Sequence, residues 1–139
     1  MELVLALVLG LVIGSFLNVC IVRLPHRQSI ITPRSQCPQC KKPISSFDNI
    51  PVLSYFLLGG KCRRCKKKIP ARYPLVEAVN GLVSVLLYIR FRGLGVEWFI
   101  FLCFSGALLV LAFIDMDHRI LPDPITLNGI WIGILATVY

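Results

Sequence analysis

Charge is scarce in this sequence of 139 residues, and acidic charge is the scarcest. Only 16% of the residues are charged and only seven are Asp or Glu, whereas 56% are hydrophobic. The mean hydropathy is +0.75. Such a composition is too apolar for a soluble domain of this length, so it excludes the soluble classes and indicates an integral membrane protein.

Three further signals are missing. The chain starts Met1-Glu2 with no basic residue before its first apolar run, which argues against a cleaved signal peptide. No glycine-rich nucleotide loop is visible, and Gly59-Gly60 alone is a weak sign of one. The aromatic residues of the basic segment 23–74 sit in apolar surroundings instead of among the charges, so we expect no nucleic-acid partner.

Long apolar runs dominate what is present. Residues 3–22, 75–92 and 96–114 are each about long enough to cross a bilayer as a helix. A fourth run, 125–139, is short for a crossing. We therefore expect an all-α polytopic membrane protein with about four transmembrane helices, the fourth incomplete. Within the first helix, Gly14-Ser15 and Asn18 are expected to make close contacts with another helix.

Basic charge is concentrated in one segment. Residues 23–74 contain twelve Lys or Arg against one acid, Asp48, a net charge of +11, whereas the rest of the chain carries −3. Basic loops remain in the cytoplasm, so this segment is predicted to be cytoplasmic and the amino terminus to lie outside. Anionic phospholipid headgroups are an expected partner for such a surface.

The same segment holds two cysteine pairs. Cys37-Pro-Gln-Cys40 and Cys62-Arg-Arg-Cys65 are separated by twenty-one residues, close to the spacing of four-thiolate zinc sites. Two disulfides are the competing interpretation, but a cytoplasmic segment lies in a reducing compartment. Four thiolates leave zinc no open position, so the metal would be structural. Residues 23–74 are too few for a large core, and a small zinc-ribbon-like domain is therefore predicted between helices 1 and 2.

The remaining cysteines and an acidic residue fall in the apolar runs. Cys20 and Cys103 are expected to pack as small apolar residues. Glu77 lies near the cytoplasmic end of the second helix and shares a face with Asn80 and Gly81. It either pairs with a basic residue of the loop or belongs to the functional site.

Three of the seven acidic residues of the chain lie close together at the end of the third apolar run. Asp115, Asp117 and Asp123 lie within nine residues where a membrane helix ends. Ionisable groups at that depth usually mark chemistry or transport. A helix cap or an ion pair is the alternative for a lone aspartate, and Asp123 between two prolines could cap the fourth helix.

Four motifs, in this order, resemble the amino-terminal part of the bacterial type IV prepilin leader peptidases. They are Gly14-Ser-Phe-Leu-Asn-Val19, the paired cysteines with Asn49-Ile-Pro51 between them, Arg72-Tyr-Pro-Leu-Val-Glu77, and Asp115-Met-Asp-His-Arg-Ile-Leu-Pro-Asp123. Members of that family are membrane aspartyl proteases that remove the basic leader of prepilins and pseudopilins. Many then methylate the new amino terminus with S-adenosylmethionine.

The resemblance implies roles for particular residues. Asp115 matches the first catalytic aspartate of the family, and Cys37, Cys40, Cys62 and Cys65 match its zinc ligands. An aspartyl protease needs two carboxylates that share a proton. The family's second aspartate follows a Gly-x-Gly motif in a later helix, and this motif does not occur in the 139 residues. We therefore expect that this polypeptide alone does not cleave.

Two other functions compete with the peptidase. The first is a non-catalytic zinc-stabilised membrane module that binds pilin-like helices or secretion partners. The second, a proton-coupled transporter fragment, is weaker because the number of spans is low. Under the peptidase interpretation, the basic leader would be repelled by the +11 loop and would dock against Asp117, Asp123 and Glu77.

Overall fold

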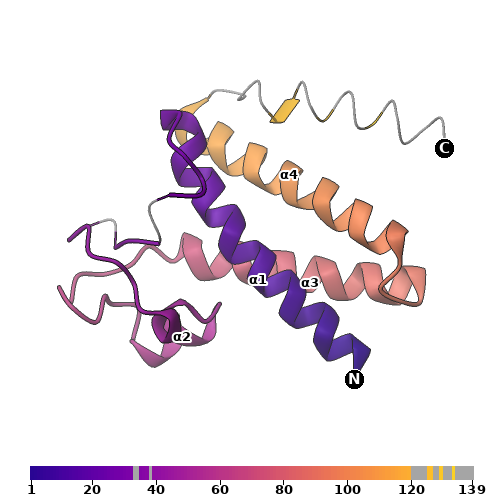
Figure 1. Ribbon diagram of the computed structural model, residues 1–139, viewed down its shortest axis with the longest axis horizontal. Coiled ribbons are helices and arrows are strands. Elements are labelled where there is room, and N and C mark those ends of the chain that lie inside the picture. Colours follow the sequence, from indigo (N-terminus) through magenta and orange to yellow (C-terminus); the bar gives the residue numbers. More distant parts are fainter. Residues whose placement is uncertain (33–34, 38, 120–124, 127–128, 130–132, 134–139) are drawn as a thin grey trace.

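The structure is a computed structural model that describes residues 1–32, 35–37 and 39–119, together with residues 125, 126, 129 and 133. Within that part of the chain it is all helical (Figure 1). The long helices are α1 (Glu2–Arg23), α3 (Arg72–Phe91) and α4 (Val96–His118). The short elements are η1 (Leu24–His26), η2 (Ser46–Asn49) and α2 (Leu53–Leu57).

The three long helices are each long and apolar enough to span a membrane. They match the three longer apolar runs, so these predicted spans are confirmed. Two helix ends differ from the sequence prediction by more than one residue. Helix α3 begins at Arg72 because Pro74 falls in its first turn, where no N–H is required. Helix α4 continues to His118, where Arg119 ends it in a left-handed conformation. Most of the expected fourth span, 125–139, lies outside the described residues.

Helices α1 and α3 run antiparallel and approach closely. Asn80 Nδ2 donates to the Gly10 carbonyl oxygen at 2.7 Å, and Ser84 Oγ donates to the Ala6 carbonyl oxygen at 2.6 Å. Nearer the loop, Asn18 Nδ2 donates to the Tyr73 carbonyl oxygen at 2.9 Å. A Cβ on Gly14 would lie 2.8 Å from the Cα of Glu77. Gly14 and Asn18 therefore make the predicted interhelical contacts.

Helix α4 completes the bundle. Its buried residues recur every four positions, so they form one stripe along the helix: Trp98, Leu102, Gly106, Val110 and Ile114. Trp98 Nε1 donates to the Ser84 carbonyl oxygen at 2.9 Å, which connects α4 to α3. Near the other end of the stripe, Val110 and Ile114 join a core cluster with Ile21 and Val76. The buried core of the bundle thus consists of two clusters, and α4 contributes to both.

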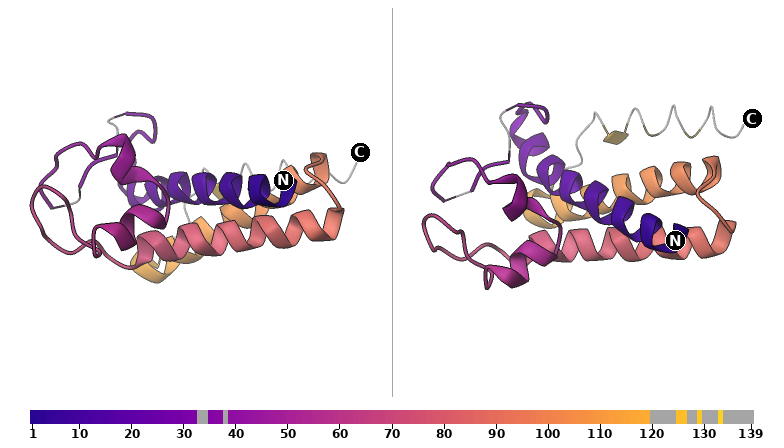
Figure 2. Two further views of the ribbon diagram at one scale, coloured as in Figure 1. Left: turned by 90° about the horizontal axis from the view of Figure 1, so that it is seen from below. Right: turned by 60° about the horizontal axis from the view of Figure 1, so that its bottom comes forward.

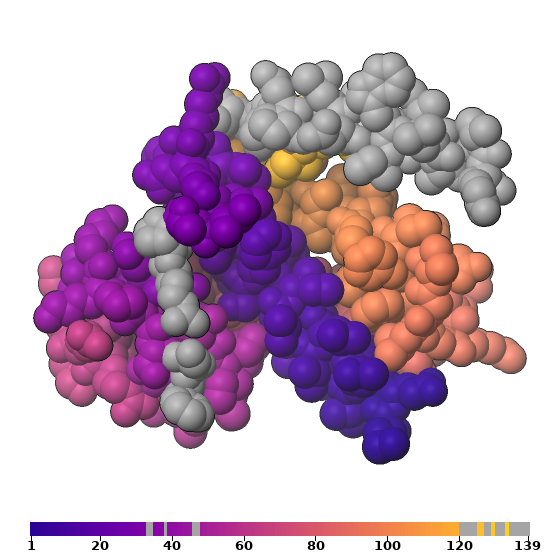
Figure 3. Space-filling view, viewed as in Figure 1, coloured from indigo at the N-terminus to yellow at the C-terminus, as the bar shows by residue number. Residues whose placement is uncertain are grey.

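The segment between α1 and α3 forms a lobe of its own at one end of the bundle (Figures 2 and 3). The carboxyl ends of α1 and α4 and the amino end of α3 lie at this end, and the amino terminus and the α3–α4 turn lie at the opposite end (Figure 1). The lobe and the end of α4 that carries Asp115 therefore lie on the same side of the bundle. This is the arrangement that the alternating order of spans predicts.

Candidate functional site

The lobe brings the four predicted metal ligands together. The sulfur atoms of Cys37, Cys40, Cys62 and Cys65 all lie within 4.8 Å of one another, and those of Cys37 and Cys65 are 3.9 Å apart. A tetrahedral ion with Zn–S bonds of about 2.3 Å would separate its sulfur ligands by about 3.8 Å. The cluster can therefore hold one metal ion with little movement of the chain.

The two cysteine pairs adopt the same local structure. In each, the N–H of the first cysteine donates to a carbonyl five positions later, and its own carbonyl accepts from the N–H four positions later. In the first pair, the Cys37 N–H donates to the Lys42 carbonyl oxygen and the Lys41 N–H donates to the Cys37 carbonyl oxygen. In the second pair, the Cys62 N–H donates to the Lys67 carbonyl oxygen and the Lys66 N–H donates to the Cys62 carbonyl oxygen. All four bonds are 2.9 to 3.0 Å long. Lys41 and Lys66 have φ of 56° and 59°, so each turn closes through one left-handed residue. The repeated geometry aims both pairs of sulfurs at a common point.

The thiol pKa values show how the sulfurs act on one another. Backbone N–H groups of Cys65 and Arg64 donate to the Cys62 sulfur and lower its pKa to about 6. The pKa of Cys65 rises to about 11: although the Lys67 N–H favours its thiolate, burial and the three neighbouring sulfurs oppose ionisation. Four thiolates this close need a cation between them. The donor set therefore fits a soft divalent metal such as zinc.

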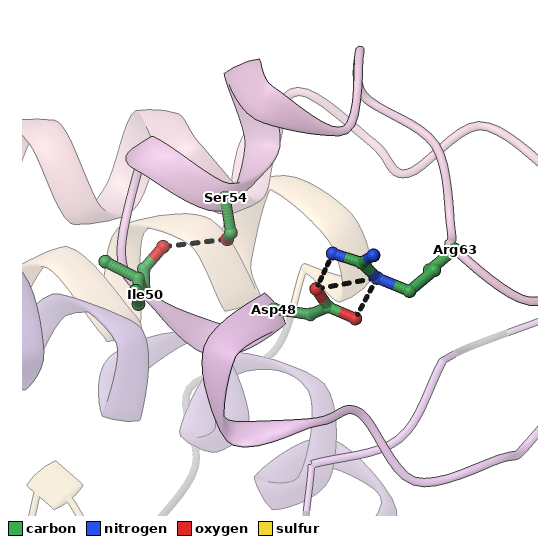
Figure 4. Close-up of polar contacts among 4 residues, drawn as sticks. All are labelled: Asp48, Ile50, Ser54 and Arg63. Atoms are coloured by element: carbon green, nitrogen blue, oxygen red, sulfur yellow. Dashed lines mark hydrogen bonds and ion pairs between the residues drawn. The ribbon is translucent and has the colours of Figure 1, made fainter.

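One ion pair joins the second cysteine pair to the segment between the pairs. Arg63 donates to both carboxylate oxygens of Asp48, with distances of 2.7 to 3.0 Å (Figure 4). Asp48 is the only acid of segment 23–74, and its side chain is only 10% exposed. Beside this pair, Ser54 Oγ donates to the Ile50 carbonyl oxygen at 2.7 Å. Sequence reasoning did not find the Asp48–Arg63 pair, although the isolation of Asp48 among basic residues was a signal for it.

Glu77 connects the lobe to helix α3. Its carboxylate oxygen accepts the backbone N–H of Val52 at 2.7 Å. Val52 has φ of 60° and ψ of −50°, which is strained for a β-branched residue. The carboxylate therefore holds a backbone conformation that the side chain of Val52 disfavours. The predicted pair between Glu77 and a basic residue of the loop is not seen in the described part of the chain, where the carboxylate contacts the loop through the Val52 amide instead.

A cavity of about 200 Å³ lies between the cysteine cluster and the start of α3. Its lining includes Cys37, Cys62, Tyr55, Tyr73 and Glu77. Glu77 is thus both the contact that fixes the lobe and part of the wall of this cavity. No sequence pattern indicated this cavity, because its lining residues are scattered between Gln36 and Glu77.

The acidic residues of α4 differ in their surroundings. Asp115 and Asp117 are two positions apart, so they point about 200° apart around the helix. Asp117 forms an ion pair with Arg72 at the start of α3. The Asp115 side chain is exposed, and among the described residues its carboxylate forms no hydrogen bond or ion pair. Asp123 lies outside the described residues.

The predicted site residues therefore fall into separate groups. The four cysteines form one cluster, and Glu77 belongs to the interface between the lobe and α3. Asp117 forms an ion pair with Arg72. In the described part of the chain, Asp115 is the acid of the α4 end whose carboxylate remains available. Sequence reasoning missed Arg72 as the partner of Asp117, because the two lie 45 positions apart.

The sequence also matches a known family. Residues 8–91 match the bacterial peptidase A24 N-terminal domain. The chain belongs to this family. It is 40% identical to a prepilin leader peptidase/N-methyltransferase of Pseudomonas putida, over 97% of this chain and 54% of that protein. Proteins of the same name from Myxococcus xanthus and Neisseria gonorrhoeae are 47% and 38% identical, over 91% and 94% of this chain.

The family membership confirms the predicted resemblance. The chain spans about half the length of the curated relatives that it matches, since it covers 54%, 38% and 54% of those three proteins. No solved structure matches the chain. The match and the fold together establish a multi-pass membrane protein of the peptidase A24 family with a four-cysteine cluster between its first two spans.

Proposed function

We propose that this chain is the catalytic amino-terminal part of a membrane aspartyl peptidase that removes the basic leader of type IV prepilins or pseudopilins. The observation that supports this most is Asp115, whose exposed carboxylate lies near the end of a spanning helix and has no partner among the described residues. In the proposal, Asp115 shares a proton with a second aspartate from a later helix. One carboxylate then activates water, and the other protonates the scissile carbonyl oxygen.

The proposal is tested by joining residues 1–139 to the carboxyl-terminal part of the Pseudomonas putida relative, which the chain does not cover. We expect the hybrid to cleave a prepilin in detergent, and Asp115→Asn to lower kcat at least about 10³-fold. The 139-residue chain alone should not cleave. Glu97→Gln, at the opposite end of the same helix, is the matched control and should leave kcat unchanged. Full activity of the Asp115→Asn hybrid would refute the assignment.

The orientation is part of the proposal. The lobe carries most of the +11 charge, so the positive-inside rule places it in the cytoplasm of a bacterial inner membrane, with the amino terminus outside. The basic lobe would face anionic phospholipid. Its lysines should then be shielded from an amine-modifying reagent in vesicles with anionic lipid but not in neutral vesicles. Equal modification in both would argue against lipid contact.

We further propose that the basic leader docks on the acidic end of α4. Asp117 and Asp123 would bind leader Lys and Arg, and Asp117 would exchange Arg72 for a leader residue on binding. Asp117→Asn in the hybrid should raise KM for a basic leader while kcat changes little. An unchanged KM in both Asp117→Asn and Asp123→Asn would exclude docking there. Glu77 is less suited to this role, because it already accepts the Val52 N–H.

Methyl transfer is a second proposed activity. Glu77, Tyr55 and Tyr73 all line the cavity between the cysteine cluster and α3, together with the basic residues Lys42, Arg63 and Arg64. A carboxylate and aromatic rings can contact the sulfonium of S-adenosylmethionine, and the basic side chains can contact its carboxylate. Zinc in the cysteine cluster would have only a structural role, since four thiolates fill its coordination shell. S-adenosylmethionine should bind the zinc-loaded chain, and the Tyr73→Ala variant should bind it with an affinity at least about tenfold lower. Equal affinity of the native chain and the variant would exclude this cavity as the binding site.

The non-catalytic module remains the second candidate. It is favoured because Asp117, the next acid along α4, points about 200° away from Asp115 and pairs with Arg72. Such a module would bind a pilin-like helix equally well with Asp115→Asn, and the hybrid would show no Asp115-dependent cleavage. The same hybrid experiment therefore separates the two functions.

A further inference from the structure

His26 and His118 are the only histidines of the chain, and the structure brings them together. His26 ends η1, just after α1, and His118 is the last residue of α4. Their ring centroids lie 5.6 Å apart with the ring planes at 85°. Both side chains are exposed, so a ligand can reach them from solvent.

This separation is the one that two imidazole ligands of a single metal ion require. A metal–nitrogen bond of about 2.0 Å places each ring centroid about 3.2 Å from the ion, so two ligands at a tetrahedral angle have centroids about 5.2 Å apart. The ring torsion χ2 of histidine is soft, and its axis passes close to the ring centroid. Turning the two rings can therefore aim one nitrogen of each at a common point while the centroids stay in place.

We propose that His26 and His118 together bind one divalent transition-metal ion of the kind that prefers imidazole, such as Ni²⁺ or Zn²⁺, with water completing its shell. The carboxyl end of α4 carries partial negative charge, and Asp115 lies one turn before His118. Arg27 and Arg119 lie next to the two histidines and oppose a cation, so the binding is weaker than at the cysteine cluster. A bound ion would fix the end of α1 to the end of α4 that carries Asp115.

The experiment uses the 139-residue chain in detergent, without a polyhistidine tag, after zinc has been added to the cysteine cluster and the excess removed. Calorimetric titration with NiCl₂ should show one Ni²⁺ per chain. Either His26→Gln or His118→Gln should weaken this binding about 10²-fold, because one remaining ring loses the advantage of chelation. Met116→Gln, an exposed change in the same turn of α4, is the control and should leave the affinity unchanged.

Two results would overturn the proposal. One is the absence of nickel binding outside the cysteine cluster. The other is independent binding, in which each single variant loses part of the stoichiometry while the remaining ion binds with unchanged affinity. Nickel that enters the cysteine cluster is recognised by its thiolate charge-transfer absorption and by released zinc, neither of which a nitrogen-bound ion produces. Thermal unfolding of both His variants verifies that they remain folded.

Discussion

At the scale of single residues, small side chains set how closely α1 and α3 approach. A Cβ on Gly10 would lie 2.5 Å from the Cβ of Ser84, 2.9 Å from the Cα of Gly81 and 3.0 Å from the carbonyl oxygen of Asn80. Two of these three neighbours are backbone atoms, which cannot turn away as a flexible side chain would. Gly10→Ala should therefore destabilise the bundle by about 1–3 kcal/mol, measured by thermal unfolding in detergent.

The chain offers a matched control for that substitution. Gly93, in the turn between α3 and α4, has no atom within 4 Å of a Cβ built on it, and its φ is not positive. Gly93→Ala should leave the unfolding midpoint unchanged. Equal losses in both variants would mean that the close approach at Gly10 is not the cause.

The contacts of single residues were the feature that could be predicted least completely from the sequence. Gly14 and Asn18 were predicted as interhelical contacts because small and polar residues are unusual in an apolar run. Their partners Glu77 and Tyr73 could not be predicted, since they depend on how two distant helices cross. The strain at Val52 was equally invisible, because nothing in the residue type asks for a left-handed φ.

At the scale of elements, the contact between Glu77 and Val52 fixes the lobe against α3. The carboxylate receives the Val52 N–H in partly buried surroundings, where a hydrogen bond to a charged group contributes about 1.5–3 kcal/mol. Glu77→Ala should therefore increase the amide exchange rate of Val52 by about tenfold or more. Hydrogen exchange resolved by mass spectrometry measures this.

Glu77→Gln is the informative comparison for that prediction, because its amide oxygen can still accept the Val52 N–H. We expect exchange in this variant to lie between those of the native chain and Glu77→Ala. The amides of α4 should be unaffected in both variants. Unchanged exchange at Val52 in Glu77→Ala would show that the lobe is held by other contacts.

Elements were predicted well where composition alone determines them. The lengths of the apolar runs were enough to predict α1, α3 and α4 as spanning helices. A bilayer requires that length whatever the helices pack against. The helix ends were less accurate, since they depend on tertiary contacts. The last turn of α4 holds Asp117, which pairs with Arg72 of α3, and the prediction from residues 96–114 alone could not include this turn.

At the scale of the whole molecule, the lobe and the bundle are stabilised in different ways. The bundle has a core of buried side chains from all three long helices. In segment 24–71, by contrast, Cys37 and Cys62 are the only buried side chains among those whose burial the structure describes. A small core was predicted from the length of the segment, and a structural metal in the four-cysteine cluster stays a prediction.

Metal removal should therefore unfold the lobe and spare the bundle. The four sulfurs lie within 4.8 Å of one another. A strong chelator would remove the proposed cation from between them, and repulsion among the thiolates would then favour opening. Limited proteolysis should cut between residues 27 and 70, while far-UV circular dichroism falls only slightly, because helices α1, α3 and α4 contain 22, 20 and 23 residues against five in α2. Added zinc should restore protease resistance, and magnesium, which does not favour thiolates, should not. A lobe that stays resistant after complete removal of metal would mean that contacts such as Glu77–Val52 and Asp48–Arg63 hold it without an ion.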